Sequence, residues 1–269
     1  MLLGICTIQR DRAPWIKEWV CFHYLMGFRK LYFFAHNCID DTHEVILELA
    51  KKFDIKIFVV SADVDRPQLA SYQYAYSNFG HEVDWMAFID GDEFLFPVEK
   101  PTLQEALIEF DDEKISALAV YWATFGSSGH ISEPEGLIIN NYRYRLKLDH
   151  SHNQHIKSIV RGRQGELVTV GPNAHMFNTT RGTFDERMRP IGFGRTDYVP
   201  THEKFRINHY TLQSWNFYKN WKQTSGAADA GRSLIRPDSH FYELDGHDEH
   251  DTTMDRFIPA VEKLIEDIS

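Results

Sequence analysis

The stretch WMAFIDGDEFLF, residues 85–96, decides the predicted fold. Its apolar beginning has the length of a strand, gives way to acidic residues around Gly91, and then resumes. A buried strand that ends at Asp90 presents carboxylates at the edge of a sheet, and Asp90 and Asp92 point the same way in an extended chain. Two such carboxylates suit Mg²⁺ or Mn²⁺. The alternative interpretation is a polar turn, because Asp-Gly is a common turn signal.

Strand patterns alternate with helical patterns ahead of this stretch. We expect strands at residues 2–8, 31–34, 55–60 and 85–89, separated by helices at 11–26, 42–53 and 67–79. Asp11 is the expected cap of the first helix, Pro14 lies in its first turn, and Gly27 ends it. Near-continuous apolar strands in a β-α-β order predict a parallel sheet that is covered on both faces.

Polar loops follow three of these strands, at residues 9–12, 36–42 and 90–93. Ligands of such sheets bind beyond the carboxyl ends of the strands. We therefore expect the three loops to converge on one site.

The pattern changes beyond Pro97. Thr102 and Glu105 form a capping-box pattern for a short helix, and residues 115–125 predict a long aromatic strand. Further elements are expected as short strands at 138, 142–146, 156–160 and 167–170, a helix from Ser214 to Trp221, and a last helix at 253–268.

Composition sets limits on function. The chain has 269 residues, 43% of them hydrophobic, which is enough for one large α/β domain. Its net charge of −10 argues against a nucleic-acid-binding surface. Three cysteines fall within the first forty residues without metal-ligand spacing, which favours reduced thiols and a cytoplasmic protein. Residues 1–8 lack the basic flank of a signal peptide, and no stretch reaches the length of a membrane span.

Several motifs, in this order, have the character of one enzyme family. They are Arg10-Asp11 with WIKEW at 15–19 and His23, Gly27-Phe28, Asn37 with Asp40-Asp41-Thr42, Asp90 to Phe94, Phe125 to Gly129, Lys157 to Val160, and Asn208-His209-Tyr210. With these motifs the chain resembles the family 92-type and related family 2-like glycosyltransferases of GT-A fold. One departure is that Tyr210 is followed by Thr-Leu-Gln-Ser rather than by a basic residue ahead of Ser214.

The resemblance implies one GT-A domain over residues 1–269, with a nucleotide-sugar-binding half at 1–97 and an acceptor-side half at 98–269. It implies a metal-dependent, inverting transfer of a sugar from a UDP-sugar to a glycan or glycoconjugate, on the cytosolic side and peripheral to a membrane. Asp92 and His209 are the expected Mn²⁺ or Mg²⁺ ligands, and Asp90 acts through water or on the ribose. Expected contacts with the nucleotide or diphosphate are Arg10, Asn37, Asp40, Asp41, Asp90, Gly91 and Lys157.

The catalytic base is left open among His175, Asp185, Glu133 and Glu135, with His175 favoured because it follows a strand-like segment and the Gly171-Pro172 turn. Trp122 and Phe125 can stack on a sugar, although aromatic residues at strand spacing are more often core. The histidine clusters at 150–155 and 247–251 are expected to be solvated loops.

Two other functions compete with this prediction. A nucleotidyltransferase shares the nucleotide-binding sheet and the acidic metal site, but normally has a Gly-rich loop after the first strand, and residues 9–12 contain no glycine. A non-catalytic sugar- or nucleotide-binding protein is the second alternative, and intact Asp90 and Asp92 argue against it.

Overall fold

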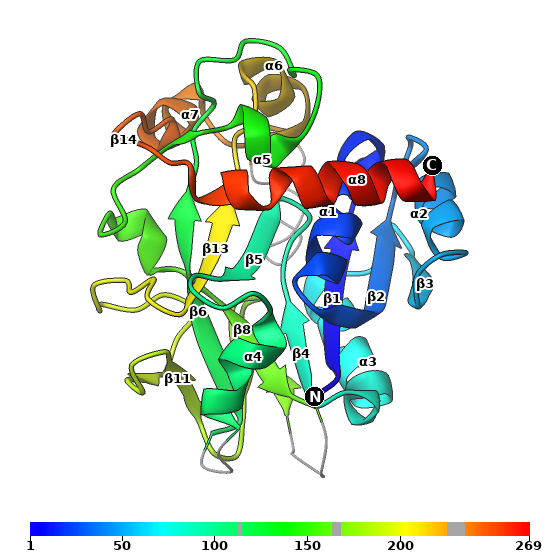
Figure 1. Cartoon of the computed structure of the whole chain (residues 1–269), viewed down its shortest axis with the longest axis vertical. Helices are drawn as coiled ribbons and strands as arrows, with labels where there is room; N and C mark the ends of the chain where they lie inside the picture. The colour runs from blue at the N-terminus through cyan, green and yellow to red at the C-terminus, as the bar shows by residue number, and fades with distance from the viewer. Residues whose placement is uncertain (112–114, 163–167, 225–234) are drawn as a thin grey trace.

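The computed structural model describes residues 1–111, 115–162, 168–224 and 235–269 (Figure 1). In these ranges, ten strands form one mixed sheet in the order β12-β11-β6-β8-β4-β1-β2-β3, and β13 joins β6 to β5. The strands are β1 (Leu3–Gln9), β2 (Phe28–His36), β3 (Ile55–Val60), β4 (Trp85–Phe88), β5 (Glu93–Pro97), β6 (Ala117–Thr124), β8 (Ile156–Arg161), β11 (Thr183–Asp185), β12 (Pro190–Ile191) and β13 (Phe205–His209). The predicted α/β class with a large, mostly parallel central sheet is confirmed.

Helices and short two-stranded ladders surround the sheet. The helices are α1 (Ala13–Leu25), α2 (Thr42–Leu49), α3 (Pro67–Phe79), α4 (Leu103–Leu107), α5 (Ile138–Asn141), α6 (Trp215–Phe217), α7 (Asp238–Leu244) and α8 (Ile258–Ile268), with a π-helical turn at Tyr218–Lys222 and 3₁₀ turns at Gly80–Glu82, Ile108–Phe110, Ser151–Gln154 and Thr253–Arg256. The ladders pair β7 (Tyr144–Arg145) with β14 (Glu249–His250) and β9 (Thr169–Val170) with β10 (Phe177–Asn178). Within the described ranges, no helix has the length and apolar character that a bilayer crossing requires.

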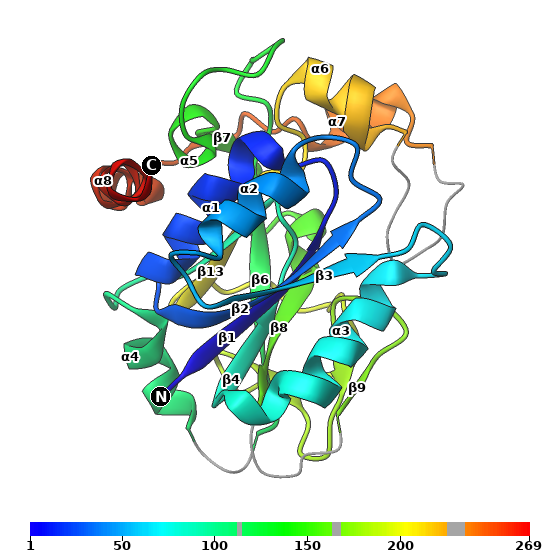
Figure 2. The ribbon, with the colours of Figure 1, turned by 90° about the vertical axis from the view of Figure 1, so that its right-hand side faces the viewer.

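Side chains of β1 alternate between two cores because successive residues of a strand point to opposite faces. Leu3 and Ile5 pack with α1 and α2, whereas Cys6 and Ile8 pack with α3. Figure 2 shows α1 and α2 on one face of the sheet and α3 on the other. The N-terminal strands β3, β2, β1 and β4 are parallel, so the loops after them meet at one edge, as their apolar sequences predict.

Strand β8 joins the two halves of the chain. It runs antiparallel to β4 on one side and antiparallel to β6 on the other. Strand β13 lies parallel to β6 and antiparallel to β5, and this register places His209 opposite Glu93. The C-terminal half therefore extends the same sheet and sends residues to the edge where β4 ends.

Two local predictions are wrong for identifiable reasons. Asp11 does not cap α1, because its backbone has a positive φ of 51° and its Oδ1 accepts the N–H groups of Ile39 and Asp40. Ile138 begins a helix rather than a strand, because the buried Glu18 carboxylate accepts the N–H groups of Ile138 and Ile139 at the start of α5. Of the strand expected at 167–170, residue 167 lies outside the described residues, and β9 begins at Thr169.

Asp251 connects the C-terminal segment to the sheet. Its Oδ2 accepts hydrogen bonds from Arg145 Nε at 2.6 Å and Arg206 Nη2 at 2.7 Å, and its Oδ1 accepts the N–H of Thr253 at 2.9 Å. Burial raises the pKa of Asp251, but the guanidinium groups of Arg206 and Arg145 outweigh it and hold the pKa well below its ordinary value. The carboxylate thus stabilises the folded state in its charged form.

Asp251→Asn is expected to lower the free energy of unfolding by about 3 kcal/mol at neutral pH, since it leaves the buried Arg206 guanidinium without its anion and leaves Arg145 with only the more exposed Glu249. Because the pKa is lower in the folded state, this contribution is complete above the ordinary aspartate value of about 4 and is lost as pH falls below it. Urea unfolding at pH 7 and pH 3 measures both effects. Asp255→Asn, which removes an exposed partner of Arg143, is the control and should leave the midpoint unchanged. A constant difference between wild type and Asp251→Asn across pH would contradict the prediction.

Candidate functional site

A cavity of about 610 Å³ lies at the carboxyl ends of the parallel strands. Its walls include residues 8–12 at the end of β1, 36–37 at the end of β2, 62 and 64–68 after β3, and 90–92 after β4. The expected convergence of the three polar loops is therefore confirmed. The opposite wall comes from the C-terminal half, through β6, β8, β13 and the segment after α6.

Asp90 stands at this edge with one oxygen strongly engaged. Its Oδ1 lies 3.0 Å from Lys157 Nζ and accepts hydrogen bonds from Gln68 Nε2 and, at 3.2 Å, from Tyr72 Oη. Burial raises the pKa of Asp90, but the Lys157 ammonium outweighs it and lowers the pKa below its ordinary value. Lys157 is only 1% exposed, and its Nζ also lies 3.9 Å from a Glu93 carboxylate oxygen. Asp90 is thus oriented by β8 and by an i, i+4 pair on α3.

Asp92 faces the C-terminal half of the chain. Its Oδ2 accepts a hydrogen bond from Lys222 Nζ at 2.7 Å, and its Oδ1 lies 3.6 Å from His209 Nε2. The backbone N–H of Tyr210 donates to Asp92 O at 2.8 Å, which attaches the end of β13 to this turn. Burial raises the pKa of Asp92, yet Lys222, followed by His209, outweighs it and holds the pKa well below its ordinary value.

The turn that carries both aspartates is rigidly held. The Trp19 indole N–H donates to Glu93 O at 2.9 Å and to Asp90 O at 3.2 Å, and the Asp90 N–H donates to a Glu93 carboxylate oxygen at 2.9 Å. A Cβ on Gly91 would lie 2.5 Å from the buried Gln9 side chain, so a larger residue here would require Gln9 to shift. Trp19, the second tryptophan of the WIKEW motif, therefore holds the acidic turn in place by hydrogen bonds to the backbone of that turn.

A divalent cation fits between Asp92 and His209. The Oδ1 and Nε2 atoms are 3.6 Å apart and do not hydrogen-bond, and one carboxylate oxygen with one imidazole nitrogen is a suitable donor pair for Mn²⁺. His209 is 5% exposed, and its other ring nitrogen, Nδ1, has no hydrogen-bond partner among the described residues. Asp90 is less available as a direct ligand, because three donors already engage its Oδ1.

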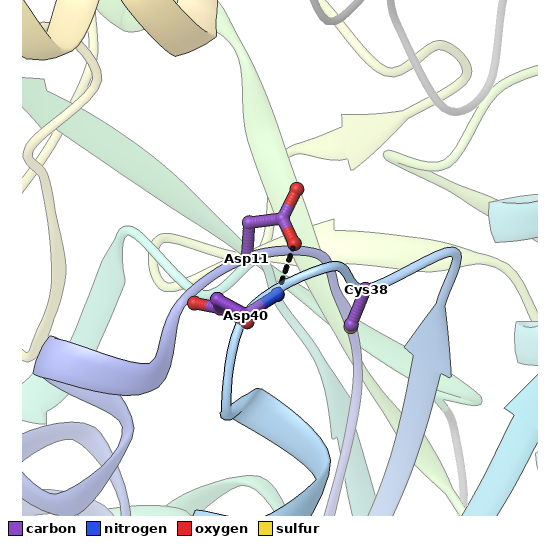
Figure 3. A group of neighbouring side chains, drawn as sticks. All are labelled: Asp11, Cys38 and Asp40. Atoms are coloured by element: carbon purple, nitrogen blue, oxygen red, sulfur yellow. Dashed lines mark hydrogen bonds between the residues drawn. The ribbon is translucent and has the colours of Figure 1, made fainter.

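Asp11, Cys38 and Asp40 form another group with metal-ligand chemistry (Figure 3). Their carboxylates serve the backbone instead. Asp11 accepts two N–H groups of the loop after β2, and Asp40 accepts the N–H groups of Thr42 at 3.0 Å and Ala13 at 3.1 Å. We interpret the group as a clamp between two loops.

The predicted nucleotide contacts divide into two groups. Arg10, Asn37, Gly91 and Lys157 line the cavity with Asp90, whereas Asp40 and Asp41 do not. The Asp40 carboxylate instead accepts the backbone N–H groups of Ala13 and Thr42, the first residues of α1 and α2. Asp41 is exposed beside the clamp.

The structure separates the candidate bases. His175 lines the cavity, and its Nδ1 lies 3.0 Å from Ile156 O. A carbonyl only accepts, so Nδ1 carries the proton and Nε2 is unprotonated. Burial, aided by Lys157, lowers the pKa of His175 to about 3. Asp185 is not at the cavity: it is fully buried in β11, where its carboxylate binds Arg189 and Tyr121.

Glu133 and Glu135 also lie outside the main cavity. They line a shallower neighbouring hollow with Trp15 and Trp221, and Glu133 accepts a hydrogen bond from Ser214 Oγ at 3.0 Å. Phe125 is core, at 1% exposure.

A wall of rings around Trp122 lines the cavity, and its members His152 and His155 were not predicted there. The Trp122 ring centroid lies 4.2 Å from that of His209, 5.0 Å from His155, 5.2 Å from His175 and 5.6 Å from His152. The expectation that the cluster at 150–155 is a solvated loop is wrong for His152 and His155, which pack on Trp122 and line the cavity. Burial lowers the pKa of both rings, so this wall is uncharged at neutral pH.

Comparisons with known proteins agree on one family. The profile of Glycosyltransferase family 92 matches residues 2–237. Glycosyltransferase family 92 protein Os08g0121900 of Oryza sativa subsp. japonica is 26% identical over 220 residues, which are 80% of this chain and 34% of that protein. Glycosyltransferase family 92 protein RCOM_0530710 of Ricinus communis is 28% identical over 223 residues, 80% of this chain and 36% of that protein. The chain thus spans about a third of the length of these curated relatives.

Among solved structures, S. aureus TarS 1–349 in complex with UDP-GlcNAc matches at 16% identity and a TM-score of 0.42, over 60% of this chain and 46% of that one. A TM-score this low supports no conclusion about substrate. The family profile is decisive, because its match extends from β1 through Asp92, Lys157, His209 and Lys222 and so includes nearly the whole cavity wall. The chain belongs to glycosyltransferase family 92.

Proposed function

We propose that this chain is a metal-dependent glycosyltransferase that moves a sugar from a UDP-sugar to a glycan or glycoconjugate acceptor with inversion. The observation that carries the proposal is the pairing of Asp92 with His209 in a cavity at the carboxyl ends of parallel strands. Residues 1–97 act as the nucleotide-sugar half and residues 98–269 as the acceptor half of one GT-A domain. Three free cysteines fit a cytoplasmic enzyme.

Asp92 and His209 would hold Mn²⁺ or Mg²⁺, which when bound stabilises the charge of the departing diphosphate. Lys157 and Arg10 supply fixed positive charge from opposite walls of the cavity. Asp90, oriented by Lys157, Gln68 and Tyr72, is available to a ribose hydroxyl or a water molecule through its other oxygen. Asn37 and Gly91 line the same cavity and are proposed to contact the nucleotide.

His175 is the proposed base. An inverting transfer needs a group that accepts the proton of the acceptor hydroxyl. The unprotonated Nε2 of His175 offers a lone pair in the cavity, although a pKa of about 3 makes it a weak base in the empty site. The Nδ1–H bond to Ile156 O fixes this tautomer. The uncharged wall around Trp122 lies beside His175 and is the proposed surface for the sugar rings.

Calorimetry with UDP tests the proposal. UDP is expected to bind at least about tenfold more tightly with Mn²⁺ than with EDTA, and a panel of nucleotide sugars should show slow hydrolysis of one UDP-sugar only when metal is present. Equal UDP affinities under both conditions would overturn the proposal. Metal-dependent UDP binding without any turnover would instead indicate a non-catalytic nucleotide-binding protein, and pyrophosphate release from UTP with a sugar phosphate would indicate a nucleotidyltransferase.

A further inference from the structure

Lys222 is a cavity residue that the roles assigned above do not use. It ends the π-helical turn after α6, and its side chain is 22% exposed. Its Nζ lies 2.7 Å from Asp92 Oδ2, although the two residues are 130 positions apart in the chain. The Arg236 guanidinium donates to Lys222 O at 2.8 Å, so the backbone at this point is held in place.

Each aspartate of the acidic turn has one lysine ammonium group close to it. Lys157 lies 3.0 Å from Asp90, and Lys222 lies 2.7 Å from Asp92. These two ammonium groups balance the two aspartates. A divalent cation at Asp92 adds two positive charges beside the Lys222 ammonium, and like charges about 4 Å apart repel strongly in a partly buried site. The cation and Lys222 therefore compete for the same carboxylate.

A nucleotide diphosphate reverses this competition. Its negative charge compensates the added cation and offers acceptors to an ammonium that has left Asp92. Lysine places a compact charge on a flexible four-carbon stem, so Nζ can move while the backbone stays bound to Arg236. The cavity of about 610 Å³ that Lys222 lines leaves space for this movement.

We propose that Lys222 neutralises Asp92 until a divalent cation binds there and then contacts the diphosphate of the donor. This assignment rests on the proposed function. Lys222 then weakens metal binding in the empty site and contacts the donor in the loaded site. Removal of its charge must therefore shift two affinities in opposite directions.

Lys222→Met is the test, because it keeps the length of the side chain and removes the charge. A calorimetric titration with Mn²⁺ alone is expected to give a Kd about tenfold lower than that of the wild type. Titration of UDP at saturating Mn²⁺ is expected to give a Kd about tenfold higher, since a charge-assisted hydrogen bond to phosphate is lost. Lys222→Arg should stay within about threefold of the wild type for Mn²⁺.

Lys219→Met is the matched control. Lys219 lies on the same helical turn but pairs with the exposed Asp238, so both affinities should equal those of the wild type. A Lys222→Met variant in which both affinities fall, or in which neither changes while circular dichroism shows the native fold, overturns the assignment. Failure of the proposed function is recognised separately, because the affinity of the wild type for UDP would then be the same with and without Mn²⁺.

Discussion

Asp92→Asn is expected to reduce kcat/KM for sugar transfer by at least about a thousandfold while the chain stays folded. The amide keeps the size of the side chain but lacks the charge that would bind a cation together with His209, and metal-ion catalysis contributes several kcal/mol to such reactions. The substitution also removes the ion pair with Lys222. Rates of transfer from the UDP-sugar, and UDP binding with and without Mn²⁺, measure the effect.

Asp41→Asn is the control for this experiment. Its carboxylate lies in a neighbouring loop outside the cavity, so transfer should continue at the wild-type rate. Loss of the folded state of Asp92→Asn by circular dichroism would favour the interpretation of residues 90–93 as a structural turn. Wild-type activity in the folded variant would refute a metal-binding role for Asp92.

Lys157→Met is expected to affect both stability and activity. Lys157 is buried between Asp90 and Glu93, and its removal leaves the Asp90 carboxylate without its buried cation. Breaking a buried ion pair in this way costs about 3 to 5 kcal/mol of unfolding free energy. Transfer should also fall by about a hundredfold, because a charged hydrogen bond near the diphosphate and the orientation of Asp90 are both lost. Urea unfolding and steady-state rates measure the two effects.

A double variant separates these contributions. Asp90→Asn added to Lys157→Met removes the uncompensated charge, so the unfolding free energy should partly recover, whereas activity should not. A double variant less stable than both single variants would mean that Lys157 stabilises the fold through packing rather than through Asp90.

The sequence predicted the order of the first four strands and their meeting loops because buried parallel strands have continuous apolar runs. It also predicted Asp90, Asp92, Lys157, His175 and His209 as site residues, and the structure brings all five to one cavity. Their roles stay predictions.

What the sequence missed has a common physical cause. The segment after β13 and α6 brings Lys222 to Asp92 in the folded chain. The local sequence around either residue does not indicate this contact. His152 and His155 lie in a polar stretch whose sequence is typical of a solvated loop. In the folded chain both rings pack against Trp122. Asp40 was predicted to contact the nucleotide, but it accepts backbone N–H groups at two helix starts instead. An aspartate that binds a ligand and one that caps a helix have the same local sequence.

The antiparallel placement of β8 between β4 and β6 has a consequence for how this chain can be recombined. Lys157, the cation that Asp90 faces, belongs to β8 and therefore to the C-terminal half. Consider a chimera that keeps residues 1–97 and takes the remainder from a relative. In this chimera the residue that faces Asp90 would come from the relative and would replace Lys157. Residues 1–97 alone would also expose the edge of β4 that β8 now covers. The two halves of the chain are thus not interchangeable modules, and swaps between relatives should begin with the contacts of Lys157.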